Sequence, residues 1–334
     1  MINAQGRPRA GAVVRNGFMY DQGLGIRRRR WLLWTFGLAA AWLCSVAAQQ
    51  AQQAAQPKDE REEEIDYYKE VRSYVDQTLF ELGWNMPELR DVAPPSSPEE
   101  VQQAETRLLN LVGENVKEFV ESFPGTSANE EITMQQLWHD GKVVASKTRS
   151  FRYAIVRQGV GERSSLHEYR TDQAGKPEEP WGLFKGFRPT TGFASTIVQF
   201  HPLGRSDALF RYLGKETLAG KETDVVAFAQ RPGLTQVAGR VELGREKSIR
   251  MLLQGVAWID PASQQIVRLR TDLLAPLVDA GLFRYTTQVS FREVRLGETS
   301  KPRWLPAEVT VTTERNDAIY RNIHRFSDYA LVAH

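Results

Sequence analysis

The sequence predicts an α+β protein in which an antiparallel β-sheet is covered by an N-terminal helical hairpin. Three observations support this prediction. Up to residue 124, apolar residues recur every three or four positions, which is the period of a helix with one buried stripe. From residue 131 onward, runs rich in β-branched and aromatic residues alternate with turn residues, as in antiparallel strands. The chain has 334 residues, 41 % of them hydrophobic, which suffices for one large core and a smaller element.

The first 48 residues form a predicted export signal. Four arginines at 27–30 precede an apolar run at 31–44, and small residues at 45–48 follow it. This order is typical of a secretory signal peptide, with cleavage expected after Ala47 or Ala48. The alternative is an uncleaved membrane anchor, because the apolar run counted through Ala48 approaches the length of a spanning helix. We therefore expect the protein to be periplasmic or secreted.

Charge and cysteine content exclude several functions. Residues 1–48 hold seven arginines and one aspartate, and the 36 basic and 40 acidic residues that remain give a net charge of −4. A body of this sign has no overall attraction for phosphates, so we expect no nucleic-acid binding. A lipoprotein signal needs a small residue directly before its cysteine, but Leu43 precedes Cys44, so we interpret Cys44 as part of the apolar run and not as a lipidation site. The cleaved chain would lack cysteine, which excludes thiol catalysis and disulfides. The charged region before the apolar run is long if translation starts at Met1, and a start at Met19 would give it a more usual length.

Residues 49–64 are a predicted polar linker, and residues 65–124 are predicted to form the helical hairpin. An apolar stripe predicts one helix over 65–82. The second helix is expected to begin at Ser97, which can cap it, and to end at Pro124. We expect the hairpin to cover an open face or edge of the sheet; the alternative is a docking arm for another envelope protein.

Residues 125–334 are predicted to form the sheet domain. An Asp140–Gly141 turn predicts a first hairpin, and a turn at 219–221 predicts a second one. The strand after the second turn is apolar on both faces, which favours a central position. Over 285–291, alternate residues point to the same face, and the pattern changes phase after Phe291. This change predicts a bulge or a bend.

No residue pattern indicates catalysis. The chain lacks a Gly-x-Ser-x-Gly elbow, a phosphate loop, a dinucleotide fingerprint and a His-Glu-x-x-His motif. Five histidines share no ligand spacing: His139, His167, His201, His324 and His334. His324 and Asp328 share a strand face but lie about 13 Å apart, so we interpret them as a polar strand end. We expect no enzyme, cofactor or metal site; a metal site assembled only in three dimensions, and a hydrolase using His324 or His167, are weaker alternatives.

Six aromatic residues are candidates for lining a ligand site. Residues 172–192 form a long segment rich in glycine, proline and charge, which is either a lid or a packed surface loop. The candidates are Trp181, Phe184 and Phe187 within it, Phe193 and Phe200 near it, and Trp258 in a later strand. They could floor an apolar cavity or pack as ordinary core.

The run Gly255–Asp260, followed by Gln265–Leu269, resembles lipoprotein-carrier (LolA/LolB-like) envelope proteins, in which a strand ends in an acidic residue and a second strand carries a basic one. Further motifs fit the same strand order: Tyr212-Leu213-Gly214, Gly220-Lys221, and Leu305-Pro306 before Val309-Thr310-Val311. The resemblance covers about 137–334. It implies a strongly curved antiparallel sheet, a half-barrel, closed by helices around an apolar cavity for acyl chains. The helical segment at 65–124 and the larger size depart from the carriers. The closing segment 320–329 is also similar to uncharacterised exported bacterial proteins.

Two functions follow from these observations. The first is an exported, non-enzymatic protein that binds or carries a lipid or another hydrophobic small molecule in the cell envelope. The second is a structural or interaction protein of the envelope, with a filled core, no ligand and another envelope protein as its partner. In both cases, we expect membrane contact only through an uncleaved leader.

Overall fold

The computed structural model describes residues 14–15, 58–161, 164–177, 190–236, 238–243, 247–297 and 301–332. Except for residues 14–15, the predicted export signal lies outside the described residues. The same holds for three candidate aromatics, Trp181, Phe184 and Phe187.

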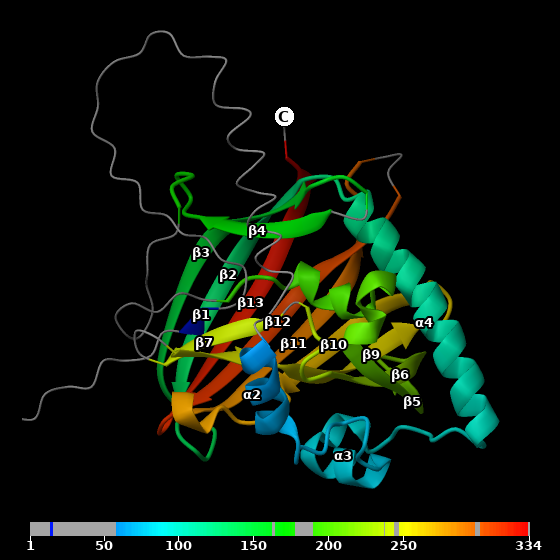
Figure 1. Cartoon of the computed structure of the whole chain (residues 1–334). Coiled ribbons are helices and arrows are strands. Elements are labelled where there is room, and N and C mark those ends of the chain that lie inside the picture. Colours follow the sequence, from blue (N-terminus) through cyan, green and yellow to red (C-terminus); the bar gives the residue numbers. More distant parts are fainter. Residues whose placement is uncertain are drawn as a thin grey trace, which may run out of the picture.

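A ten-stranded antiparallel sheet confirms the predicted α+β class (Figure 1). Its strands are β2 (Thr126–Leu137), β3 (Val143–Gln158), β4 (Ser165–Thr171), β5 (Ala208–Leu218), β6 (Lys221–Gln230), β9 (Leu253–Asp260), β10 (Gln265–Leu273), β11 (Leu282–Val294), β12 (Arg303–Arg315) and β13 (Ala318–Leu331). The spatial order is β4-β3-β2-β13-β12-β11-β10-β9-β6-β5. Between β6 and β9 the chain forms β7 (Gly239–Leu243) and β8 (Lys247–Met251), which make a small sheet with β1 (Val14–Arg15).

The expectation of a strongly curved half-barrel is wrong, because the sheet is twisted but not strongly curled (Figure 1). Bulges bend strands, and most of the register shifts lie near strand ends, where they bend little of the sheet. Those shifts are at Gln136/Leu137, Ile266/Arg268, Leu282/Arg284 and Ser327/Ala330. Two further shifts lie inside strands, at Tyr212/Gly214 in edge strand β5 and at Ser290/Phe291 in β11. The sheet remains open, with β4 and β5 at its edges.

The side-chain alternation of the central strands follows the sequence. Four alternate residues of β11 are buried: Tyr285, Thr287, Val289 and Phe291. They define the inner face of the sheet. The irregularity predicted after Phe291 lies one residue earlier, where the register with β12 shifts between Ser290 and Phe291, and the pairing after Phe291 is regular. Strand β6 lies between β5 and β9 and is buried on both faces, as predicted.

The N-terminal helices do not form the predicted hairpin. They are α2 (Lys58–Tyr68), α3 (Leu79–Asn85) and α4 (Pro98–Glu121). The single helix expected over 65–82 is interrupted after Tyr68. Asp76 accepts hydrogen bonds from the backbone and side chain of Ser73, and Thr78 then starts α3 with a capping box. The predicted start of α4 at Ser97 is confirmed by its hydrogen bond from the Glu100 N–H.

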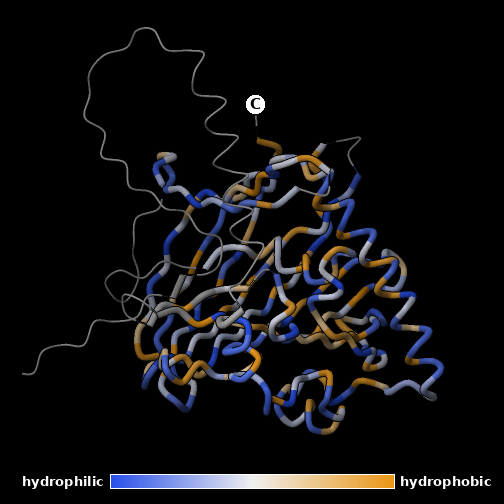
Figure 2. The backbone as a smooth tube through the Cα atoms, in the orientation of Figure 1, coloured by the Kyte–Doolittle hydropathy of each residue, from blue (hydrophilic) through white to orange (hydrophobic). Residues whose placement is uncertain are grey.

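These helices cover opposite faces of the sheet. Helix α4 and the 3₁₀ helix η3 (Ala194–Phe200) pack on the inner face, and blue and orange alternate along α4 in Figure 2, as expected for an apolar stripe. Helix α3 and the 3₁₀ turn η1 (Pro87–Leu89) pack on the outer face. The outer cluster includes Leu82, Met86 and Leu89 from this segment, and Val225, Ala227, Val256 and Trp258 from the sheet.

A strap at residues 90–97 carries the chain from the outer to the inner face around edge strand β5. Ala93 donates to the Lys215 carbonyl at 2.8 Å and accepts from the Lys215 N–H at 3.0 Å. Gly214 has a φ of +128°, and a Cβ there would lie 2.0 Å from the Ala93 oxygen. Only glycine fits this approach. The strap covers part of a sheet edge that would otherwise expose unpaired backbone groups.

Candidate ligand site beneath helix α4

Helix α4 lies over the inner face mainly through apolar contacts. Its buried residues are Ala104, Leu108, Val112, Gly113, Val116, Phe119 and Val120. Polar contacts hold it at a few points. Asn115 donates to the Gln264 carbonyl at 3.0 Å, and Lys301 pairs with Glu118 at 2.6 Å. Near the middle of the helix, Arg205 donates to Asn110 at 2.8 Å.

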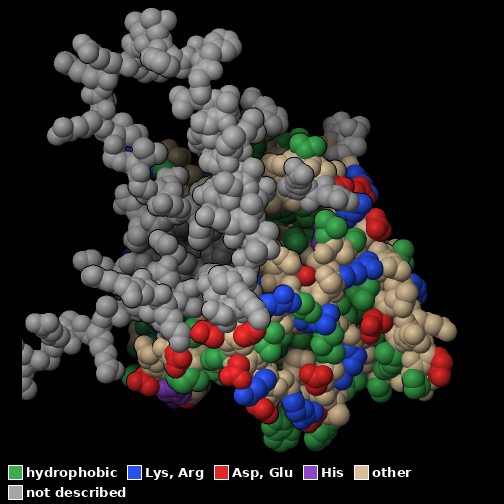
Figure 3. Space-filling model, viewed as in Figure 1, with side chains coloured by type: hydrophobic (Ala, Val, Ile, Leu, Met, Phe, Trp, Pro, Cys, Tyr) green, Lys and Arg blue, Asp and Glu red, His purple; other side chains and the backbone are tan. Residues whose placement is uncertain are grey.

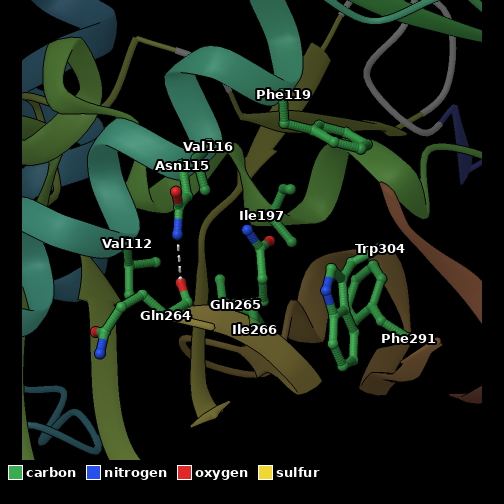
Figure 4. A pocket seen from close by; sticks show the side chains of 10 residues that line it. All are labelled: Val112, Asn115, Val116, Phe119, Ile197, Gln264, Gln265, Ile266, Phe291 and Trp304. Carbon is green, nitrogen blue, oxygen red and sulfur yellow. Dashed lines mark hydrogen bonds between the residues drawn. The ribbon is translucent and has the colours of Figure 1, made fainter. Parts of the chain in front are cut away.

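A narrow slot lies between α4, η3 and the sheet (Figure 4). It is lined by Val112, Asn115, Val116, Phe119, Ile197, Gln264, Gln265, Ile266, Phe291 and Trp304. Its volume is about 10 Å³, so side chains fill almost all of this slot. Most of the lining is apolar, and the Asn115–Gln264 contact lies at its polar side.

The structure separates the predicted aromatic site residues. Phe193 and Phe200 are buried in the inner core. The Phe200 ring packs 5.7 Å from Phe228. Trp258 is fully buried on the outer face, where the Arg268 guanidinium lies 4.9 Å from its ring and Glu216 accepts its indole N–H. Trp258 therefore cannot share a site with the inner aromatics.

A buried ionic cluster on the inner face was not predicted. Arg170 donates to both carboxylate oxygens of Glu130, at 2.6 and 2.8 Å, and to the Thr190 carbonyl at 3.0 Å. The His324 Nδ1 lies 2.8 Å from Glu130, and the three side chains are at most 2 % exposed. Burial opposes ionisation of Glu130, but the Arg170 charge and the hydrogen bonds outweigh it and lower its pKa to about 2.

His324 is thus a core residue and not the polar strand end expected from sequence. Asp328 hydrogen-bonds instead to Asn129, at 2.8 Å, and it does not reach His324. The sequence gives no signal for the cluster, because Glu130 and Arg170 are 40 positions apart and Glu130 and His324 are 194 apart.

Glu168 fixes the start of η3 and so places its apolar residues. The carboxylate accepts the backbone N–H groups of Gly192, Phe193 and Ala194 at 2.7–2.8 Å, and the Tyr153 hydroxyl donates to it. Burial raises the pKa of Glu168 despite these donors. The contacts hold the chain that carries Ile197 over the slot.

Two absences apply to the described part of the chain. Its histidine, aspartate and glutamate side chains form no group of three or more that could hold a metal ion. No helix in these ranges is long and apolar enough to cross a membrane.

No protein-family model matches the chain, and no curated protein matches it significantly. Solved structures similar to it include a DUF1329 family protein from Desulfovibrio piger, at 12 % identity and a TM-score of 0.38, covering 68 % of this chain and 92 % of that one. A domain assigned to outer membrane lipoprotein-sorting proteins, from Vibrio parahaemolyticus, matches at 12 % identity and 0.37, covering 67 % and 91 %. A LolA superfamily protein from Nitrosomonas europaea matches at 14 % and 0.32, covering 68 % and 94 %. The similar structures thus include a LolA superfamily protein, the kind of protein that the sequence resembles, and identities this low transfer neither ligand nor activity.

Proposed function

We propose that this chain is an exported, non-enzymatic protein of the cell envelope that binds or carries a lipid or another hydrophobic ligand. The ligand site is the slot between α4 and the inner face. The observation that supports this proposal is the mostly apolar lining of the slot, beneath a helix that separate polar contacts attach to its surroundings.

Ligand entry requires α4 to move away from the sheet. A pocket for a small hydrophobic molecule holds roughly 300–1,000 Å³, far more than the slot provides. Each polar contact of α4 contributes only about 0.5–1.5 kcal/mol, which is a small barrier to displacement. A hydrophobic ligand would cover the same apolar side chains that α4 covers, so the burial lost by the helix is offset by burial against the ligand.

The predicted site residues divide under this proposal. Phe193 and Phe200 lie in the same core as the slot, so they would border an enlarged site. Trp258 faces the opposite side of the sheet and takes no part. A lid formed by Trp181, Phe184 and Phe187 remains a prediction from sequence.

A second candidate function is favoured by the filled slot. A slot with about 10 Å³ of free space needs no ligand for its stability, which fits a structural or interaction protein of the envelope. The two candidates differ in whether a hydrophobic probe enters beneath α4.

Filling the slot tests the first candidate. Ile197 is 8 % exposed and lines the slot, while its neighbour Val198 is 38 % exposed and does not. The measurement is the affinity for a fluorescent fatty acid and its displacement by an unlabelled one. We expect Ile197→Trp to weaken binding about tenfold or more, and Val198→Trp to leave it unchanged.

Thermal unfolding confirms beforehand that both variants fold, because overpacking costs about 1–3 kcal/mol. If the unmodified protein binds no probe, or if Ile197→Trp binds as well as Val198→Trp, the site beneath α4 is rejected and the second candidate stands.

A further inference from the structure

Helix α3 exposes two large aromatic side chains on one face. Phe80 is 81 % exposed and Trp84 is 75 % exposed. They are four residues apart, so they lie side by side on the helix surface. The opposite face of α3 is buried, since Leu82 is fully covered in the outer cluster. Helix α3 therefore has apolar residues on two opposite faces, and only one of these faces packs against the rest of this chain.

The turn between β2 and β3 exposes a second apolar group. Trp138 is 62 % exposed, and Val143, which follows the turn, is 47 % exposed. Strand pairing places the start of β11 at the same end of the sheet, because β2 pairs with β13, β13 with β12, and β12 with β11. There, Val278 is 62 % exposed and Phe283 is 45 % exposed. We call Phe80, Trp84, Trp138, Val143, Val278 and Phe283 the apolar end.

One flat surface could contact both aromatic groups. Helix α3 and the β2–β3 turn both lie along the lower edge of Figure 1, and hydrophobic side chains form the lowest part of Figure 3. Two contacts tie α3 to the segments before and after it: Arg72 donates to Glu81, and Arg90 donates to the Gly83 carbonyl at 2.9 Å. A narrow protein groove would accept one group, whereas a broad apolar layer accepts both.

We propose that the apolar end lies against the surface of a lipid bilayer. Tryptophan combines an apolar ring with a polar N–H, so it is favoured where a bilayer meets water. In a chain that keeps its leader, the length of chain before α2 fits this partner. The predicted apolar leader segment ends at residue 48, and nine residues separate it from Lys58. They span at most about 30 Å, which keeps the body close to any bilayer that holds the leader.

This surface goes beyond the proposed ligand site and does not depend on it. The sequence predicts membrane contact through the leader alone, whereas the apolar end would fix the orientation of the folded body. Helix α3 packs on the outer face and the slot lies on the inner face, so the two proposals involve different residues.

Site-specific fluorescent labels test the orientation. Cys44 is the only cysteine of the chain, so a Cys44→Ser background allows one label at a time, introduced as Trp84→Cys, Trp138→Cys or Val160→Cys. Val160 is the control, because it is 84 % exposed and follows β3, whose 16 residues separate it from the β2–β3 turn by about 50 Å. The full chain is incorporated into phosphatidylcholine–phosphatidylglycerol vesicles that carry nitroxide-labelled lipids.

We expect lipid quenching at positions 84 and 138 to be at least twofold stronger than at position 160. A Phe80→Ser/Trp84→Ser variant should keep its thermal unfolding midpoint and its fatty-acid affinity, while quenching at position 138 falls. Equal quenching at all three positions, or quenching at 138 unchanged by the double substitution, would overturn the proposal. Loss of fatty-acid binding in the Ile197→Trp variant reports on the ligand site alone, so the two proposals can fail separately.

Discussion

On the inner face, we expect a substitution of Glu130 to lower the stability of the fold most. Its carboxylate lies between Arg170 and His324, in a place without exposure to solvent. We predict that Glu130→Gln lowers the free energy of unfolding by about 3–5 kcal/mol, because it leaves the Arg170 charge buried without its counter-ion. The neighbouring Glu131 is about half exposed and reaches Arg325 only at 4.0 Å. Glu131→Gln is the matched control and should cost under about 1 kcal/mol in urea unfolding. Equal losses would show that the cluster contributes little.

The same carboxylate predicts a dependence on pH. The pKa of Glu130 is about 2 in the folded chain, below its ordinary value of 4.5. A lowered pKa stabilises the fold above about pH 4.5, and this contribution is lost as the pH falls toward 2. The difference in unfolding free energy between the unmodified protein and Glu130→Gln should therefore shrink over this range. A difference that stays constant from pH 6 to pH 3 would contradict the lowered pKa.

Among the elements, the strap over β5 gives the sharpest prediction. Gly214→Ala places a Cβ against the Ala93 carbonyl, so the strap must move and its two hydrogen bonds weaken. We expect a loss of about 2–4 kcal/mol and faster proteolysis within residues 90–97. Gly220→Ala is the control. It also has a positive φ, of +80°, but meets nothing within 4 Å, and it should cost only about 1–2 kcal/mol without exposing the strap.

Helix α4 should act as the cover of the ligand site. In the Cys44→Ser background, Asn115→Cys and Gln264→Cys place thiols on the two sides of an existing contact between α4 and the β9–β10 turn. A short bismaleimide crosslink should abolish fatty-acid binding relative to the same double variant left unlinked, which carries the same two substitutions in the slot lining. Binding that survives crosslinking would mean that ligands enter without displacement of α4.

The elements differ in how far the sequence determines them. The alternation of β11 and the cap of α4 depend on neighbours within a few residues, so both could be predicted. The prediction of one helix over 65–82 was wrong because the Ser73–Asp76 hydrogen bonds compete locally with helix formation. The apolar stripe in the sequence does not reveal these hydrogen bonds.

At the scale of the whole molecule, the site depends on register and on the choice of face. Phe193 and Trp258 look equivalent as isolated aromatics, but the sheet separates them. The ionic cluster joins residues of β2, β4 and β13. Strands β2 and β13 are paired in the sheet although they lie near opposite ends of the domain in sequence. Neither arrangement leaves a local pattern. The curvature of the sheet could not be predicted from the sequence either, because it depends on where along the strands the bulges lie.

The N-terminal segment covers the sheet from both sides, and this gives each face a separate role. The outer face is closed by α3 and the strap, while the inner face is closed by α4 over an apolar slot. Ligand binding should therefore respond to changes under α4 and be insensitive to changes around Trp258. Trp258→Leu should lower stability by a few kcal/mol through the cavity it leaves, without altering fatty-acid affinity.

The most direct measurement is solvent extraction of the purified protein followed by mass spectrometry. It is carried out on the unmodified chain and on Ile197→Trp, purified in parallel from the same cells. We predict that the unmodified protein yields a lipid or another hydrophobic molecule in stoichiometric amount, and that Ile197→Trp yields much less. Equal and trace yields from both proteins, together with no binding of an added fatty acid, would contradict the claim that the inner face beneath α4 carries a ligand.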